Sequence, residues 1–248
     1  VHHGKFGGVL NGVDYDIWNP EIDPFIPARY SADSLDRKYE NKERLRERFL
    51  LRKTWSPVVA FVSRLDEQKG MHLVHHALFY ALARGAQFVL LGDAFHHHGI
   101  SSHFRGLKRY LNESPDCHLE IGYSEELAHL VYAGADLQVV PSMFEPCGLA
   151  PMIGMRYGTV PVVRAVGGMV DTVFDRDYSA RSPAERNGYV FHQPDNTGIE
   201  SALSRALGLW FSYPAEFRQL AVNAMCADYS WARPAQDYLN IYEHIRHK

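Results

Sequence analysis

The chain has 248 residues, 46% of them hydrophobic and 22% charged, and its formal net charge is −3. A chain of this length buries roughly 70–75% of its unfolded surface, so one large domain is expected. The charge balance gives no basic surface for nucleic acid, and no apolar stretch approaches the roughly 20 residues that span a bilayer, so neither nucleic acid nor a membrane is an expected partner.

Short apolar runs rich in β-branched residues alternate with amphipathic stretches along the chain. After a loop-rich segment at 23–34 and a charged helix near 34–51, strands are expected at 58–62, 87–91, 118–121, 137–140, 160–163 and 189–191. Helices are expected near 71–84, 101–111, 124–133, 148–157, 169–173 and 197–211, followed by closing helices at 213–227 and, after a Ser230 N-cap, 231–247. The crossovers are long enough for right-handed βαβ units, which predicts an α/β fold with a doubly wound, Rossmann-like parallel sheet.

Polar groups crowd the end of the strand expected at 58–62. The following residues read Ser-Arg-Leu-Asp-Glu-Gln-Lys-Gly over 63–70. Arg64 offers a planar fork for phosphate oxygens and Lys69 a point charge, and we expect both to be solvated loop cations. Taken alone, the pair is more often ordinary surface charge.

A carboxylate, Glu145, follows the strand expected at 137–140, at the edge where open α/β sheets hold ligands. Backbone N–H groups and the positive end of a helix follow, contributed by Cys147, Gly148, Leu149 and Ala150. A carboxylate beside an anion-binding loop fits a ligand with a hydroxyl-rich part and a phosphorylated part, such as a sugar nucleotide. The alternative is that Glu145 merely caps the helix.

The strings Ser-Arg-Leu-x-x-Gln-Lys-Gly at 63–70 and Phe-Glu-Pro-Cys-Gly-Leu at 144–149 resemble the signatures of starch and bacterial glycogen synthases. These are retaining glucosyltransferases with two Rossmann-like domains, the GT-B architecture. The similarity covers nearly the whole chain, through segments at 9–14, 18–20, 155–164, 167–171 and 229–231. Residues 152–158 look most like the starch synthase III/IV branch.

The resemblance implies a division of the chain into three parts. Residues 1–34 correspond to a hinge segment, 35–228 to the nucleotide-sugar-binding domain, and 229–248 to a C-terminal crossover helix. The chain would be the C-terminal half of such an enzyme, and the N-terminal catalytic domain is an expected partner. Without it, an apolar face of the last helix is expected to be exposed, made of Tyr238, Ile241, Tyr242 and Ile245.

The resemblance also implies a reaction, the transfer of glucose from ADP-glucose to the non-reducing end of an α-1,4-glucan with retention. Arg64 and Lys69 would neutralise the departing ADP, and Glu145 would hold sugar hydroxyls. Tyr123 would pack on the adenine, with ordinary core packing as the alternative, and Gly167 and Gly168 would complete the nucleotide-sugar site. Neither a cofactor nor a metal is implied, since ADP-glucose is the donor substrate and ADP the product.

Two departures from the family pattern matter, because Ala150 and Val166 stand where family members carry threonines. We expect these changes to affect catalytic rate more than fold. Two alternatives therefore remain for the chain: it is a non-catalytic ADP- or glucan-binding module, or it belongs to another retaining nucleotide-sugar transferase. The isolated chain is expected to bind nucleotide without elongating glucan.

The cysteines and histidines say less about function than the two motifs do. Three cysteines, an odd number without paired metal spacing, favour a reducing compartment over a disulfide framework. The implied location is the plastid stroma for a plant or alga and otherwise the bacterial cytoplasm. The histidine trio at 96–98 is taken as solvated variation rather than a metal site.

Overall fold

The computed structural model describes residues 7–93 and 98–246. Six strands of this part of the chain form one sheet in the order β3-β2-β1-β4-β5-β6, with every pairing parallel. The strands are β1 (Val58–Arg64), β2 (Gln87–Asp93), β3 (Cys117–Ile121), β4 (Leu137–Val140), β5 (Val160–Arg164) and β6 (Tyr189–Phe191). The doubly wound Rossmann-like sheet is therefore confirmed, because the order reverses between β1 and β4.

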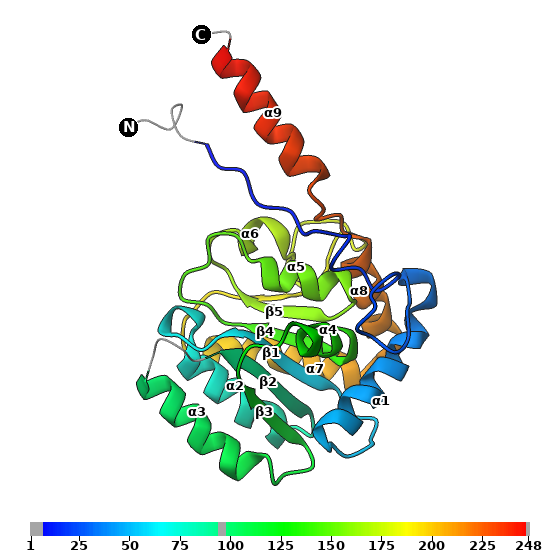
Figure 1. Cartoon of the computed structure of the whole chain (residues 1–248), viewed down its shortest axis with the longest axis vertical. Helices are drawn as coiled ribbons and strands as arrows, with labels where there is room; N and C mark the ends of the chain where they lie inside the picture. Colours follow the sequence, from blue (N-terminus) through cyan, green and yellow to red (C-terminus); the bar gives the residue numbers. More distant parts are fainter. Residues whose placement is uncertain (1–6, 94–97, 247–248) are drawn as a thin grey trace.

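Helices cover both faces of the sheet (Figure 1). They are α1 (Lys38–Phe49), α2 (Met71–Ala83), α3 (His98–Leu111), α4 (Glu125–Gly134), α5 (Leu149–Arg156), α6 (Met169–Thr172), α7 (Asn196–Ser212), α8 (Pro214–Cys226) and α9 (Ala232–Arg246). The first charged helix begins later than expected, because Ala32–Arg37 forms a 3-10 helix in which Ser34 has non-helical backbone angles (φ −119°, ψ 31°). The histidine trio at 96–98 falls outside the positions whose side chains the structure describes.

The central strands β1, β2, β4 and β5 are mostly apolar on both faces, because helices cover each face of the sheet. Along β1, Val59 and Phe61 belong to the core that includes α2 and α7, whereas Val58 and Ala60 belong to the core that includes α1 and α4. Continuous apolar runs are the expected sequence of a buried parallel strand. This two-sided burial made the strands recognisable in the sequence.

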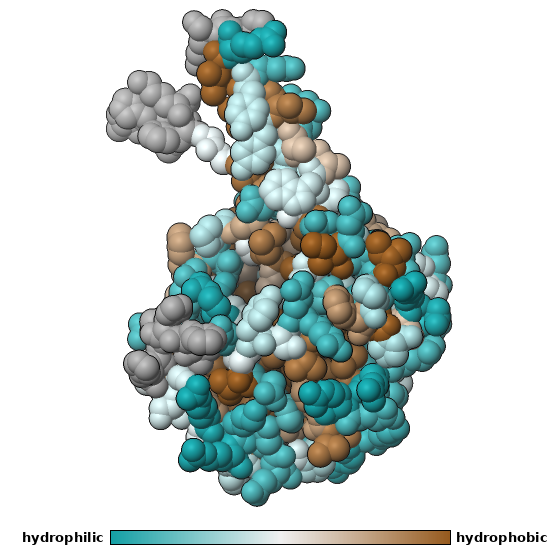
Figure 2. Space-filling view, viewed as in Figure 1, coloured by the Kyte–Doolittle hydropathy of each residue, from teal (hydrophilic) through white to brown (hydrophobic). Residues whose placement is uncertain are grey.

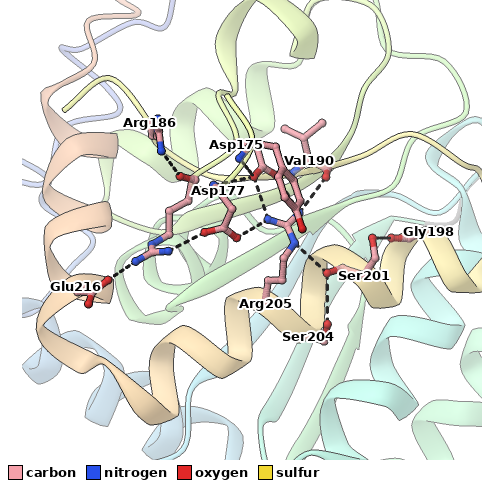
Figure 3. Close-up of polar contacts among 11 residues, drawn as sticks. Asp175, Asp177, Arg186, Val190, Gly198, Ser201, Ser204, Arg205 and Glu216 are labelled. Atoms are coloured by element: carbon pink, nitrogen blue, oxygen red, sulfur yellow. Dashed lines mark hydrogen bonds and ion pairs between the residues drawn. The ribbon is translucent and has the colours of Figure 1, made fainter. Parts of the chain in front are cut away.

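The loop between α6 and β6 is fixed by a buried charge network (Figure 3). Arg205 of α7 makes two ion-pair contacts with Asp175, at 2.9 and 3.0 Å, and the same carboxylate accepts the Val190 amide at 2.7 Å. Arg205 also contacts Asp177 at 2.7 Å. These contacts satisfy the buried carboxylate and join the edge strand β6 to α7.

The segment before α1 packs against the body of the domain. Trp18 stacks on His129 of α4 with ring centroids 4.0 Å apart, and His129 Nδ1 lies 2.7 Å from Asp23 Oδ2. Tyr157 donates a hydrogen bond to the same carboxylate at 2.5 Å. His129 and Asp23 are almost fully buried, so this part of the expected hinge is built into the interior.

The last helix, α9, projects from the body beside the N-terminal segment (Figure 1). Pro234 is its one buried residue, while apolar and aromatic side chains are exposed along it (Figure 2). Tyr238, Ile241, Tyr242 and Ile245 are all among the exposed residues, which confirms the expected apolar face. No helix of the described residues is long and apolar enough to cross a membrane.

The three thiols are expected to differ in reactivity. Burial raises the pKa of Cys117 to about 12, so fewer than about one thiol in 10³ is ionised there at pH 8. Cys226 is exposed, and the half-buried Cys147 has a pKa raised by burial. Alkylation of the native chain at pH 8, followed by mass spectrometry, should modify Cys226 first, Cys147 more slowly and Cys117 last. In urea all three should react alike; rapid native labelling of Cys117 would contradict the packing described here.

Candidate functional site

Two loops meet where the carboxyl ends of β1 and β4 lie side by side. The Met143 amide donates to the Gln68 carbonyl at 2.7 Å, and the Gln68 side chain donates to the Phe144 carbonyl at 2.9 Å. From the far side, the Arg164 guanidinium of β5 contacts the carbonyls of Ser142 and Met143 at 3.2 and 3.0 Å. The loop that carries Glu145 is therefore held on both sides.

Lys69 and Glu145 form an ion pair at the centre of this junction. Lys69 Nζ lies 2.5 Å from Glu145 Oε2, and their side chains are only 13% and 12% exposed. The Ser142 hydroxyl donates to the same carboxylate oxygen at 3.0 Å. The expectation that Lys69 is a solvated loop cation is therefore wrong, because its charge is neutralised largely away from water.

Arg64 occupies a different position. Its side chain is 61% exposed, and its Nη1 lies 3.1 Å from Asp66 Oδ2. The two predicted cations therefore each face a carboxylate of the protein itself. Arg64 does remain free enough to meet a ligand, whereas Lys69 reaches one only beside Glu145.

The alternative that Glu145 caps α5 is wrong. The N-cap of α5 is Gly148, whose φ of +87° favours glycine, and no side chain accepts a capping hydrogen bond there. Among the described contacts, the amides of Leu149 and Ala150 donate to no protein acceptor. Pro151 occupies the first turn, where a missing N–H costs little. Free amides at a helix N-terminus suit an anion.

The loop after β5 closes on this region at two glycines. A Cβ on Gly167 would lie 1.8 Å from the Glu145 carbonyl oxygen, and one on Gly168 would lie 2.3 Å from the Cys147 carbonyl oxygen. Only glycine permits such a close approach between the two backbones. Gly167 and Gly168 thus fix the Glu145 loop. The half-buried Cys147 has only a 3.8 Å contact with the Asn11 carbonyl, and burial raises its pKa, which fits packing rather than nucleophilic chemistry.

Tyr123 lies at the mouth of a cavity of about 400 Å³ at the carboxyl ends of β1, β2 and β3. Its side chain is 77% exposed, so the alternative of core packing is wrong. The cavity has an apolar floor that includes Trp18, Tyr132 and Ile153, and Arg64 also lines it. An apolar slot with an exposed aromatic ring and a cation at one end suits a nucleotide base and its phosphates.

Sequence reasoning missed several residues that shape the site. Gln68 lies inside the motif at 63–70, so the sequence showed it only as a member of that motif, and Ser142 lies two residues before the motif at 144–149. Trp18 lay in the presumed hinge, and its place in the cavity floor follows from the tertiary packing of that segment. Arg164 ends the family-like segment at 155–164 and follows an expected strand, and neither fact predicted its contacts with the Glu145 loop.

A Rossmann-like sheet with free helix amides, an ion pair and an apolar cavity at one carboxyl edge defines an α/β domain with a candidate ligand site at that edge. A family model described as "Glycosyl transferases group 1" matches residues 56–208. The chain therefore belongs to this glycosyltransferase family.

Individual relatives agree with this assignment. The chain is 59% identical over its full length to glycogen synthase 2 of Methylococcus capsulatus and to a probable glycogen synthase 2 of Nostoc sp.. It spans about half of each relative's length, 51% and 50%. The catalytic domain of starch synthase IV from Arabidopsis thaliana, bound to ADP and acarbose, matches with a TM-score of 0.94 and 40% identity over 98% of this chain and 50% of that one. The resemblance to starch and glycogen synthases is confirmed.

Replacing Lys69 should destabilise the domain more than expected for a surface cation. Lys69→Ala strands a largely buried carboxylate, which should lower the free energy of unfolding by roughly 2 kcal/mol or more. The double variant Lys69→Ala/Glu145→Gln should recover part of this loss because the unpaired charge is gone. Urea denaturation of both variants checks this. Equal stabilities for Lys69→Ala and the wild type would show that the pair is as weak as a solvated one.

Proposed function

We propose that this domain binds ADP-glucose and forms part of a glucosyltransferase that extends an α-1,4-glucan with retention at the anomeric carbon. The observation that carries the proposal is the Lys69–Glu145 pair, 2.5 Å apart, set beside free helix amides and the Tyr123 cavity. A carboxylate repels a diphosphate, so its presence at an anion site is useful only if it faces hydroxyl groups. A sugar nucleotide supplies both.

The nucleotide end of the donor would occupy the Tyr123 cavity. The exposed ring offers a stacking surface for adenine, and the apolar floor excludes water from the other face. Arg64 stands at the rim, where its guanidinium meets the phosphates. The Leu149 and Ala150 amides would take the remaining phosphate oxygens.

The sugar end would lie against Glu145. In the free protein the Lys69 ammonium neutralises this carboxylate, and with the donor bound the same ammonium would face the leaving phosphate. As the bond to ADP breaks, negative charge grows on the phosphate beside a cation that is already in place, which is preorganised electrostatic stabilisation. Glu145 would then orient the glucose through charge-assisted hydrogen bonds to its hydroxyls.

The acceptor glucan and a second domain are the proposed partners. The exposed apolar side chains of α9 and the adjacent N-terminal segment offer a surface for that domain. The two glycogen synthases named above, each 59% identical to this chain, are bacterial, which favours the bacterial cytoplasm over the plastid. Without the second domain, the chain is expected to bind ADP and to leave glucan unextended.

Isothermal calorimetry tests the nucleotide end. The chain should bind ADP, and Tyr123→Ala should weaken binding about tenfold because a stacking surface is lost. Tyr110→Ala provides a matched control, since Tyr110 is 73% exposed and does not line the cavity. Equal ADP affinity for the Tyr123 variant and the wild type would show that the ring does not contact the nucleotide. Absence of any ADP binding by the wild-type chain would overturn the proposal.

Glucose transfer tests the sugar end. The chain can be joined to the part of the Methylococcus capsulatus relative that it does not span, and transfer from labelled ADP-glucose to glycogen measured. Glu145→Gln should lower turnover roughly 10²-fold or more, the scale for one preorganised charged group. ADP affinity should hold or improve, because a negative charge has left the anion site. Unchanged turnover with lost ADP binding would reverse the assignment of Glu145 to the sugar.

A further inference from the structure

Asp66 is a buried aspartate whose side chain does not cap the helix that it precedes. It stands at the N-terminal boundary of the short 3-10 helix η3 (Glu67–Lys69) and is only 6% exposed. An aspartate at a helix start normally accepts a backbone amide with its side chain. Here no side-chain capping bond is present. Helix capping therefore does not account for this carboxylate.

The two oxygens of Asp66 have different surroundings. Oδ2 contacts Arg64 Nη1 at 3.1 Å, whereas Oδ1 is buried with no hydrogen-bond partner among the described residues. An unsatisfied buried carboxylate oxygen costs folding free energy. A residue kept at such a cost in a ligand-binding loop points to function rather than to stability.

The loop holds Asp66 in place. Between Arg64 and Asp66, Leu65 is 1% exposed, and its amide donates to the Asp93 carbonyl at 2.7 Å. The Asp66 carboxylate therefore has a defined position, and the exposed Arg64 guanidinium is paired with it. Arg64, 61% exposed at the rim of the Tyr123 cavity, would otherwise sample many rotamers.

We infer that Asp66 is a positioning residue that holds Arg64 toward the phosphates of the bound nucleotide. This inference rests on the proposed function, because it assumes that the cavity takes ADP. The second, unpaired oxygen gives the guanidinium a place for a two-point contact, the geometry that arginine and carboxylate favour.

The direction of the change in ADP affinity on replacing Asp66 separates a positioning role from a purely electrostatic one. Asp66 carries a negative charge near the phosphate site, so its charge by itself opposes ADP binding. If charge alone mattered, Asp66→Asn would tighten ADP binding. If positioning dominates, the same substitution loosens it.

Calorimetry with ADP and adenosine provides the test. Asp66→Asn should weaken ADP binding about tenfold, the scale of one charge-assisted contact, and leave adenosine binding unchanged. In an Arg64→Ala background the positioning effect is absent and only the charge effect remains, so Asp66→Asn should no longer weaken ADP binding and should leave it equal or slightly tighter. Asp66→Glu, which keeps the charge but moves it, should also weaken ADP.

Asp36→Asn is the matched control, because it removes the same charge from an exposed pair with Arg218 of α8, outside the cavity lining. Equal or tighter ADP binding by Asp66→Asn, or an equal loss in the Arg64→Ala background, would overturn the inference alone. A wild-type chain that binds no ADP would overturn the proposed function and the inference with it.

Discussion

The parallel pairing of β1 with β4 is the constraint on which the site depends. Val59 pairs with Leu137 and Ala60 with Gln138, although 78 residues separate the members of each pair. Because the strands run in the same direction, the loops that leave them emerge at one edge. Lys69 and Glu145 can then meet at 2.5 Å, and the Gln68 contacts lock their loops together. A shift of either strand along the other would separate the carboxylate from the ammonium and expose both.

The charges of this edge are arranged in local pairs. Lys69 is matched by Glu145 and Arg64 by Asp66, so the free domain presents no strong concentration of positive charge. A diphosphate therefore has to compete with carboxylates for both cations. This competition lowers affinity for simple anions and favours a ligand that can satisfy the carboxylates at the same time. Under the proposed function, this arrangement would favour a sugar nucleotide over inorganic phosphate.

The fold was readable from the sequence because the central strands β1, β2, β4 and β5 are buried on both faces over most of their length. The apolar run at 58–62 lies within β1 (Val58–Arg64), and the run at 137–140 coincides with β4 (Leu137–Val140). The site was only partly readable. Motifs identified Lys69, Glu145 and the helix amides, but the ion pair joins residues 76 positions apart and depends on strand register. The solvation of Lys69 was misjudged for this reason, since local sequence carries no information on what the neighbouring loop places above a side chain.

The Trp18–His129 stack sets a physical limit on how small this domain can be made. The family match begins at residue 56, yet Trp18 forms part of the cavity floor and Asp23 is buried against His129. Asn41 of α1 exchanges two hydrogen bonds with the backbone of Ala28, at 2.9 and 2.8 Å, which joins the preceding segment to the helix. A chain cut at the family boundary would lose Trp18 from the floor of its own cavity and expose His129 to water. The segment that the family model matches is therefore shorter at its N-terminal side than the segment that packs as one body, and a minimal domain has to begin ahead of Trp18.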